Sequence, residues 1–384
     1  MRILFLAPQP FFEVRGTPLA VRALVSELGE LGHEVDLLTY PRGEAVSIPG
    51  VRHLRSVNLP VGRVPPGPSV AKFALDIPFL AEAKLRMAFG GYALVHAVEE
   101  AGLLLSPSAR LLGLPLVYDM DSSIPEQLQD AGAPGMLVRL ASFFERHALR
   151  HAVAAITVCP SLTATARSEA PGLRVFQIED PPLPSFADAG AEGALRTLAA
   201  SLGLEKTNVV LYTGNFEPYQ GVDILLEATG EVPGAAFVFV GGEAAEVARL
   251  EERARALGTA PRCRFVGKRP PSEIPLFLAL AEVVVSPRIR GRNTPFKIYS
   301  YLGSGKPLVA TAIESHTQVL DPSVAFLVDP TSHGIAGGIR EALENKAEAK
   351  ERAERAAALV AREYSAMRYS EKVRAAYQAI AASL

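Results

Sequence analysis

Two short segments combine an arginine, a threonine and a proline in a way that suits the binding of an anion. They are Arg15-Gly16-Thr17-Pro18 and Arg292-Asn293-Thr294-Pro295, and each precedes a segment with helical periodicity. Helix N-termini attract phosphates through free amide groups and a partial positive charge. Threonine is a good N-cap, and proline suits the first helical position. A good helix start explains one such segment, but two of them, one in each half of the chain, favour a shared anionic ligand.

A glycine follows the apolar run Val209–Thr213 at a place where a ligand could approach the backbone. Gly214 leaves room for that approach because it has no side chain, although an ordinary turn explains the same glycine. No Gly-x-Gly-x-x-Gly follows the run Ile3–Ala7, and Gly303-Ser-Gly-Lys306 lacks the spacing of a Walker loop. The sequence therefore predicts an anion site without a dinucleotide or Walker motif.

Apolar runs of strand length alternate with segments of helical periodicity along nearly the whole chain. This alternation is typical of a doubly wound, parallel α/β sheet, in which ligands bind beyond the carboxyl ends of the strands. It stops at Asp180-Pro-Pro-Leu-Pro, because prolines cannot continue a helix or a sheet, and restarts at Val209. We predict a linker over 180–193 between two Rossmann-like domains, 1–180 and 194–365. A last helix over 366–384 is expected to cross back to the first domain.

Composition excludes several classes of protein. The 384 residues are 49% hydrophobic and 21% charged, which indicates a folded chain long enough for two domains. The net charge of −2 argues against a nucleic-acid partner. Two distant cysteines exclude a disulfide framework and fit a reducing cytoplasm. No apolar run is long enough for a membrane span, and the short N-terminal run does not resemble a signal peptide.

The stretch from Arg292 to Ala310 resembles the donor-binding segment of glycosyltransferase family 4. The stretches 212–228 and 32–39, and Phe265-Val-Gly267, resemble further family motifs in the same order, so the similarity covers nearly the whole chain. It implies the GT-B fold, in which two Rossmann-like domains face each other across a cleft that holds the active site. It also implies a UDP- or GDP-sugar donor bound mainly by the second half, an acceptor bound mainly by the first, and transfer with retention. Neither a metal nor another cofactor is expected, because positive groups stabilise the departing diphosphate.

The chain departs from the family at two pairs of positions. The family's two glutamates, eight residues apart, fall on Arg292 and Ser300, so ribose would meet a neutral hydroxyl, a weaker partner than a carboxylate. The Arg and Lys of the family's first loop in this half fall on Asn215 and Gln220. The donor-binding residues implied are Gly16, Thr17, Gly214, Asn215, Gln220, Lys268, Arg269, Arg292, Asn293, Thr294, Pro295, Phe296 and Ser300.

Three residues are candidates for the catalytic chemistry. Lys297 is the foremost substitute for the missing cations and could reach the anion site at Asn293 and Thr294, with Arg288, Arg290 and Arg292 as further substitutes. Asp121 lies near the place of a family histidine that contacts the transferred sugar, although it could equally cap the next helix. His96 resembles a histidine that follows the same strand in the family; a buried structural histidine is the alternative.

Some charged residues allow a structural or a functional interpretation. Lys268 and Arg269 lie where the family contacts the nucleobase, yet basic loop residues are commonly just solvated. Glu99 and Glu100 could line the acceptor side or be solvated at a helix start. Residues 52–86 mix basic and apolar side chains. In the family this region contacts a membrane or a lipid-linked acceptor, and an internal helix explains the same pattern.

The function that these observations favour is sugar transfer to a glycan, a lipid-linked molecule or a small molecule, with a role in cell-envelope polysaccharide synthesis. The enzyme would be cytoplasmic, with peripheral contact at the inner face of the membrane. Two alternatives stay open. The missing glutamates would fit a degenerate, sugar-nucleotide-binding partner subunit, and the fold would also fit a UDP-sugar epimerase-like enzyme or a hydrolase.

Overall fold

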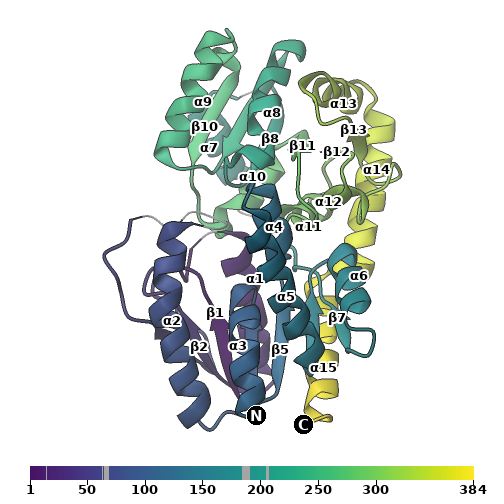
Figure 1. Cartoon of the computed structure of the whole chain (residues 1–384). Coiled ribbons are helices and arrows are strands. Elements are labelled where there is room, and N and C mark those ends of the chain that lie inside the picture. The colour runs from purple at the N-terminus through teal and green to yellow at the C-terminus, as the bar shows by residue number, and fades with distance from the viewer. Residues whose placement is uncertain (14, 63, 65–68, 184–190, 205–206) are drawn as a thin grey trace. The chain divides into compact units, whose positions relative to one another are not determined.

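The computed structural model describes the chain except residues 14, 63, 65–68, 184–190 and 205–206 (Figure 1). Its internal contacts divide the chain into two compact units. The first comprises Met1–Glu179 and Tyr369–Leu384, and the second comprises Asp180–Arg368. Residues 184–190 of the predicted linker over 180–193 lie outside the described residues, and a helix, α7 (Ala191–Leu202), begins within its last three residues. Among those described, no helix is long and apolar enough to span a membrane.

The first unit contains a seven-stranded parallel sheet with the strand order β3-β2-β1-β4-β5-β6-β7. Most of its strands are apolar runs buried on both faces, as expected for a parallel sheet covered by helices. The strands are β1 (Arg2–Ala7), β2 (Glu34–Thr39), β3 (Val51–Arg55), β4 (Leu94–Val98), β5 (Leu116–Met120), β6 (Ala154–Thr157) and β7 (Val175–Gln177).

Helices cover both faces of this sheet. On one face α2 buries Leu75, Phe79, Ala83 and Met87, which are four residues apart and so lie on one side of the helix. The side chain of Ser69 caps this helix by accepting a hydrogen bond from the Lys72 amide at 3.1 Å. The helices of this face are α2 (Val70–Phe89), α3 (Glu100–Leu111), α5 (Gly135–His151) and α6 (Pro160–Glu169), with α4 (Ile124–Asp130) against α5; the opposite face carries α1 (Gly16–Glu30) and α15 (Ala366–Ala381).

The C-terminal helix α15 is part of the first unit. Tyr377 is buried against the face of the sheet, and its hydroxyl lies 2.6 Å from Nδ1 of His96 on β4. The other ring nitrogen of His96 lies 2.8 Å from a carboxylate oxygen of Asp119 on β5. Because a carboxylate accepts hydrogen bonds, Nε2 of His96 carries a hydrogen and the Tyr377 hydroxyl satisfies Nδ1. These contacts fix α15 to the centre of the first sheet.

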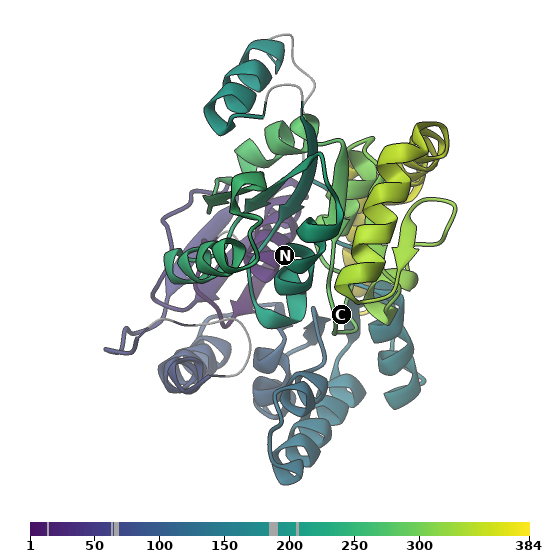
Figure 2. The same ribbon diagram turned by 90° about the horizontal axis from the view of Figure 1, so that it is seen from above.

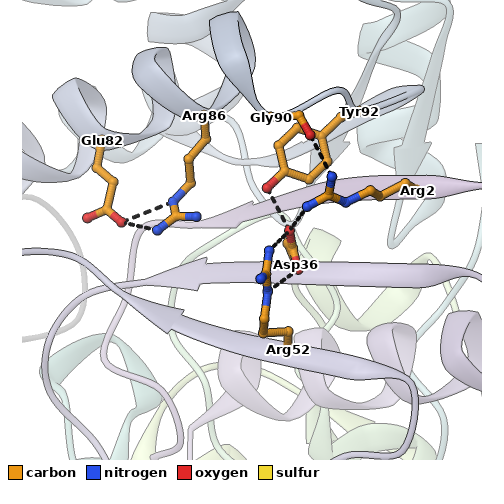
Figure 3. A network of polar contacts seen from close by, with 7 residues as sticks. All are labelled: Arg2, Asp36, Arg52, Glu82, Arg86, Gly90 and Tyr92. Carbon is orange, nitrogen blue, oxygen red and sulfur yellow. Dashed lines mark hydrogen bonds and ion pairs between the residues drawn. The ribbon is translucent and has the colours of Figure 1, made fainter.

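Near their N-terminal ends, the first three strands are joined by one carboxylate (Figure 3). Asp36 on β2 accepts hydrogen bonds from Arg52 on β3 at 2.7 Å, from Arg2 on β1 at 3.1 Å and from the Tyr92 hydroxyl at 2.6 Å. Burial alone would raise the pKa of Asp36, but the hydrogen bonds from Arg52 and Tyr92 bring it below its usual value. This network is structural, because it lies at the end of the sheet opposite to the ligand-binding edge.

The second unit repeats this plan with a six-stranded parallel sheet in the order β10-β9-β8-β11-β12-β13. The strands are β8 (Asn208–Thr213), β9 (Ala235–Val240), β10 (Cys263–Gly267), β11 (Val283–Ser286), β12 (Leu308–Thr311) and β13 (Phe326–Val328). One face is covered by α8 (Val222–Ala228), α9 (Ala244–Ala256) and α13 (Ser332–Glu344), and the other by α7 (Ala191–Leu202), α10 (Ile274–Leu280), α11 (Lys297–Gly303) and α14 (Lys346–Leu359) (Figures 1 and 2).

Both sheets confirm the predicted doubly wound α/β class, but several elements differ from the prediction. The sequence pattern missed β3, α4, α7, α10 and the short α12 (Glu314–Thr317). β3 lies at a sheet edge and contains three polar residues among its five, so it lacks a continuous apolar run. α7 is rich in alanine and follows directly after the proline- and glycine-containing segment. Leu195, Leu198 and Leu202 nevertheless have helical spacing, so the pattern indicates α7 and the prediction overlooked it.

We expect Tyr377→Phe to destabilise the protein without changing its fold. The ring still fills the same space, but Nδ1 of His96 loses its partner in a buried place, which costs about 1–3 kcal/mol. Urea unfolding followed by circular dichroism measures this loss. Gln378→Ala, an exposed change on the same helix, should stay within about 0.5 kcal/mol of the parent. Equal stabilities of Tyr377→Phe and the parent would show that this contact does not hold α15.

A buried carboxyl at the start of α4 makes stability depend on pH. Glu145 on α5 accepts hydrogen bonds from the Ser123 hydroxyl at 3.0 Å and from the Ile124 amide at 3.2 Å. Burial raises its pKa from 4.5 to about 7, although these hydrogen bonds oppose the rise. A carboxyl with a raised folded-state pKa stabilises the fold below pH 4.5, and this contribution is lost as the pH rises through 7.

The parent should lose stability between acidic and neutral pH because Glu145 ionises. Glu145→Gln should therefore remove this part of the loss. At pH 8 the variant should be more stable than the parent by about 2–3 kcal/mol, since each tenfold change in an acidity constant on folding corresponds to roughly 1.4 kcal/mol. Urea unfolding at several pH values tests this, with the exposed Glu30→Gln on α1 as the control. A parallel pH dependence in the parent and Glu145→Gln would contradict the assignment.

Candidate functional site

The strand order of the second unit indicates where a ligand binds. The chain runs outward from β8 to β9 and β10, then returns to β11 on the other side of β8. Ligands of such sheets bind beyond the carboxyl ends of the strands at this switch point. Gly214 follows β8 directly, and Arg288 lies two residues beyond β11. These two loops touch, because a side chain at Gly221, which has a positive φ of 70°, would lie 1.9 Å from the Pro287 carbonyl.

The amine of Lys297 lies at this switch point. Its Nζ donates a hydrogen bond to the side-chain oxygen of Gln220 at 3.1 Å and lies 3.9 Å from the centre of the Tyr212 ring. Within the described residues no carboxylate pairs with this amine. Burial and the nearby positive charge of Arg288 lower the pKa of Lys297 well below its usual value. The site thus holds a cation that the unit's own acidic residues do not neutralise.

The position of Lys297 is set from α11. Tyr301 is one turn further along this helix, and its hydroxyl accepts a hydrogen bond from the Thr213 amide at 2.7 Å. Residues four apart share a helix face, so Lys297 and Tyr301 both reach the end of β8, as the spacing predicts. The Tyr212 hydroxyl in turn donates to the Asn215 carbonyl at 2.6 Å, which holds the ring beneath the amine.

Close packing explains the glycine after β8. Gly214 has a φ of 139°, and a side chain there would lie 3.2 Å from Nζ of Lys297. Gly241, which follows β9, has a φ of 127° and lies so close that a side chain would meet the Gly214 carbonyl at 1.8 Å. Both conformations favour glycine. The loops after β8 and β9 therefore approach each other beside the amine of Lys297.

Arg288 organises the loop that follows β11. It is 6% exposed, and it donates to the Arg290 carbonyl at 2.8 Å, to the Asn293 carbonyl at 2.8 Å and to the Asn293 side-chain oxygen at 3.0 Å. Its guanidinium also lies 5.2 Å from the centre of the Tyr219 ring. Arg288 thus joins the two loops of the switch point and adds a second positive charge close to Lys297.

A buried histidine joins the ends of β11 and β12. Nδ1 of His316 lies 2.8 Å from the Thr311 carbonyl, so it carries the hydrogen, and Nε2 accepts from the Ser286 hydroxyl at 2.9 Å. Burial lowers the pKa of His316 to about 3, with smaller contributions from Arg288 and Lys297 in the same direction. The ring therefore stays neutral and serves to position the strand ends that carry the two cations.

The predicted threonine caps are wrong. Helix α11 begins at Lys297, and the hydroxyl of Thr294 is buried without a hydrogen-bond partner among the described residues. Helix α1 begins at Gly16, with Arg15 extended at the preceding position, so Thr17 lies inside the first turn. The Arg15 side chain donates to the Val64 carbonyl at 3.0 Å and pairs with Glu13. Helix α1 starts two residues before its predicted first position, Pro18, and α11 starts two residues after its predicted first position, Pro295, so neither threonine caps its helix.

Other predicted donor residues have partners of their own. The Ser300 hydroxyl accepts a hydrogen bond from the Leu183 amide at 2.9 Å, so it holds the segment that opens the second unit. Arg292 pairs with Glu314 at 3.2 Å. Lys268 pairs with Glu243 at 2.5 Å, and Arg269 lies 3.8 Å from Glu273. These cations are half-exposed, and surface pairs of this kind contribute little to stability, so a ligand could displace them.

In the first unit, the predicted catalytic residues lie in different surroundings. His96 is fully buried, stacks on Phe5 at 4.1 Å and uses both ring nitrogens on Asp119 and Tyr377. This is the structural arrangement that the sequence left open, and it offers no nitrogen to a substrate. Asp121 directly follows β5 at the carboxyl edge of the sheet and is 9% exposed.

The switch point of the first sheet, between β1 and β4, carries a buried ion pair. Glu100 at the start of α3 lies 2.6 Å from Nζ of Lys72 on α2, so it is not the solvated carboxylate that one alternative expected. Burial raises the pKa of Glu100 to about 7, although Lys72 acts in the opposite direction. Glu99 has a positive φ of 47°, which is uncommon for a residue with a side chain. Its carboxylate accepts from Gln127 at 3.3 Å.

Some residues that shape the site were not predicted from the sequence. Tyr212 was not selected, although it is the last residue but one of β8, two residues before Gly214, and aromatic rings attract cations. The pair Gly241-Gly242 after β9 was a similar signal, since glycines at a carboxyl strand end permit close approach. His316 carried no signal, because a single histidine in a short helix has no characteristic spacing. In the described part of the chain, no three His, Cys, Asp or Glu side chains gather into a metal site.

Comparisons with known proteins agree with this architecture. The family described as "Glycosyl transferase 4-like domain" matches residues 15–181, and "Glycosyl transferases group 1" matches residues 196–359. Alpha-D-kanosaminyltransferase of Streptomyces kanamyceticus is 26% identical over 94% of this chain and 99% of its own length.

Solved structures show the same fold at low identity. Sucrose-phosphate synthase from Thermosynechococcus elongatus matches all of both chains with a TM-score of 0.82 at 20% identity. Anabaena HepE in complex with UDP-glucose covers 99% of this chain and 100% of its own, with a TM-score of 0.79 at 18% identity. Together with the two parallel sheets and the two matched families, these likenesses show that the chain is a GT-B glycosyltransferase and belongs to glycosyltransferase family 4.

Proposed function

We propose that this enzyme transfers a sugar from UDP or GDP to a glycan or lipid-linked acceptor in cell-envelope polysaccharide synthesis, with retention of the anomeric configuration. The observation that supports it best is the amine of Lys297, which lies at the switch point of the second sheet without a carboxylate partner in the described residues. A diphosphate supplies the missing negative charge. The relatives, which include a kanosaminyltransferase and a putative colanic acid biosynthesis glycosyl transferase, favour a sugar donor and a carbohydrate product.

Lys297 would stabilise the diphosphate as it leaves the sugar. Negative charge develops on the leaving oxygen when the glycosidic bond breaks, and a fixed positive group nearby lowers the energy of that state. The partial burial of Lys297 strengthens this attraction, because water screens it less. Burial lowers the pKa of Lys297, and a diphosphate bound beside the amine would raise it again, so donor binding favours the charged form.

The geometry suggests how the chain replaces the family's missing loop cations. In the family, a lysine of this loop falls on the position of Gln220. Here the amine of Lys297 lies 3.1 Å from the Gln220 side chain, above Tyr212 and beside Gly214. The positive charge would therefore occupy nearly the same place but come from helix α11. Gln220 holds the amine there through its side-chain oxygen.

In the first unit, we assign the acceptor and the sugar to the carboxyl edge of the sheet. Asp121 follows β5 at that edge and would contact the transferred sugar. Gly16 is exposed at the start of α1, and a side chain there would meet no atom within 4 Å, so that helix start is open to a ligand together with Thr17. His96 is left as a structural residue.

A second candidate is a sugar-nucleotide-binding subunit without turnover. It is favoured by Ser300 and Arg292, which stand at the family's glutamate positions and have other partners, Leu183 and Glu314. A thermal-shift series with UDP, GDP, ADP and their sugars identifies the nucleotide. Release of free sugar or its transfer then separates the two candidates, and the anomer formed, read by NMR, tests retention.

Lys297→Gln should weaken the binding of UDP or GDP, whichever the parent binds, by about tenfold to a hundredfold. This corresponds to the roughly 1.5–3 kcal/mol of a hydrogen bond to a charged group. Isothermal titration calorimetry measures the affinity. Lys346→Gln, an exposed lysine at the start of α14, is the matched control and should bind like the parent. Unchanged nucleotide affinity in Lys297→Gln would refute the assignment of this amine to the diphosphate.

The double variant Gln220→Lys/Lys297→Gln tests where the charge is needed. It exchanges the two side chains, so a cation again lies between α11 and the loop after β8, and we expect it to recover most of the affinity lost in Lys297→Gln. Failure to recover, with both variants folded, would show that the amine must come from α11 and that the two positions are not equivalent.

A further inference from the structure

An ion pair at the carboxyl edge of the second sheet joins the loop after β11 to the short helix α12. Glu314 is the first residue of α12 and lies three residues beyond β12. Nε of Arg292 donates to both carboxylate oxygens of Glu314 at 3.2 Å, and Nη2 donates to one of them at 3.2 Å. The side chain of Glu314 is still 52% exposed. Because a carboxylate offers about four lone-pair sites, this one can accept further hydrogen bonds from a ligand.

The helix that carries this carboxylate is held from its buried side. On α12, His316 donates from Nδ1 to the Thr311 carbonyl at 2.8 Å and accepts at Nε2 from the Ser286 hydroxyl at 2.9 Å. The Gln318 side chain, just after the helix, donates to the Arg292 carbonyl at 2.6 Å. These bonds fix the start of α12 against the loop after β11. A carboxylate held in this way loses less freedom when it binds a ligand than a mobile surface carboxylate would.

The strand order indicates which part of a sugar nucleotide would reach this ion pair. The proposed diphosphate site at Lys297 lies at the end of β8, in the middle of the order β10-β9-β8-β11-β12-β13. Lys268 and Arg269, which the family resemblance assigns to the nucleobase, follow β10 on one side of it. The sugar is attached to the opposite end of the diphosphate. It would therefore extend toward the ends of β11 and β12, where Arg292 and Glu314 lie.

Two buried hydroxyls close to this ion pair in the sequence also indicate a polar ligand. Thr294 is 3% exposed and Ser315 is 0% exposed, and neither hydroxyl has a hydrogen-bond partner among the described residues. Buried polar groups in folded proteins normally have such partners. A ligand with several hydroxyl groups at this edge would supply them.

We propose that Glu314 recognises the transferred sugar by accepting hydrogen bonds from its hydroxyl groups, and that Arg292 orients the carboxylate for this contact. Hydrogen bonds to a charged acceptor are stronger than those between neutral groups. A site built to bind a hydroxyl also rejects an analogue that lacks it, so Glu314 determines which sugar is accepted. The inference rests on the proposed sugar-nucleotide donor, which brings a sugar to this edge.

Glu314→Gln tests the proposal because it keeps the size of the side chain and removes its charge. Isothermal titration calorimetry compares UDP or GDP, whichever the parent binds, with the hexose conjugate of the same nucleotide that the parent transfers or hydrolyses. The variant should bind the free diphosphate like the parent and the conjugate at least about tenfold more weakly. Glu344→Gln, an exposed change at the end of α13, is the matched control and should bind both like the parent.

Deoxy analogues of the conjugate, each lacking one sugar hydroxyl, separate direct contact from a structural effect. In the parent, loss of the contacted hydroxyl should weaken binding by about tenfold, and in Glu314→Gln the same loss should have much less effect, since contacts that share a partner are not additive. Arg292→Gln should reproduce part of the sugar-specific loss and leave diphosphate affinity unchanged. This pattern would identify Arg292 as a positioning residue.

Two results would overturn the proposal, with folding of each variant checked by circular dichroism. One is equal weakening of diphosphate and conjugate in Glu314→Gln, which would assign the ion pair to the structure of the loop. The other is the same response to every deoxy analogue in the parent and in Glu314→Gln. Failure of the proposed donor site gives a different pattern, because the parent would then bind neither UDP nor GDP, or Lys297→Gln would bind them like the parent; the inference would fall with it.

Discussion

The site of the second unit depends on one amine that the described side chains around it do not neutralise. A partly buried lysine without a carboxylate partner is unfavourable, because burial penalises the charged form. The surrounding structure nevertheless fixes Lys297 firmly, through Gln220, the Tyr212 ring and the anchoring of α11 by Tyr301. An anion that binds there stabilises the charged amine. Relief of the unfavourable burial of this charge then contributes to the binding affinity. The glycines after β8 and β9 serve this arrangement, since a side chain at Gly214 would press against the amine.

The fold was largely predictable, because buried parallel strands are continuous apolar runs separated by helical periods. β8 stood out for this reason, because the apolar run Val209–Thr213 comprises all but the first residue of the strand. Two of the elements that were missed illustrate the limits of the prediction. β3 is a half-exposed edge strand, and α7 is an alanine-rich helix beside a segment rich in proline and glycine. Their stability comes from tertiary contacts that local composition does not encode.

The site was predictable in its residue types but not in the directions of its side chains. Lys297, Gly214 and Gln220 were each selected from the sequence, and the structure brings them together. Thr294 and Ser300 had suitable chemistry and spacing as well. Thr294 fails as a cap because the helix starts three residues later, and the Ser300 hydroxyl is engaged by the Leu183 amide. Such outcomes depend on the exact residue at which a helix begins, and sequence patterns do not locate helix ends to within one or two residues.

The two units bury charge in opposite ways, and this contrast separates structural from functional polar residues. In the first unit, Glu100 lies against Lys72, and Asp119 against His96, so each of these buried acids has a basic partner. Within such a pair the opposite charges compensate each other, so the electrostatic potential around the pair is small. In the second unit, burial and then the nearby charge of Arg288 lower the pKa of Lys297, and the positive potentials of these two neighbouring groups add. Cations that reinforce each other attract an anion from solution, whereas paired charges hold a fold together. The sequence contains acids and bases in both units, and only their partners in space distinguish these two uses.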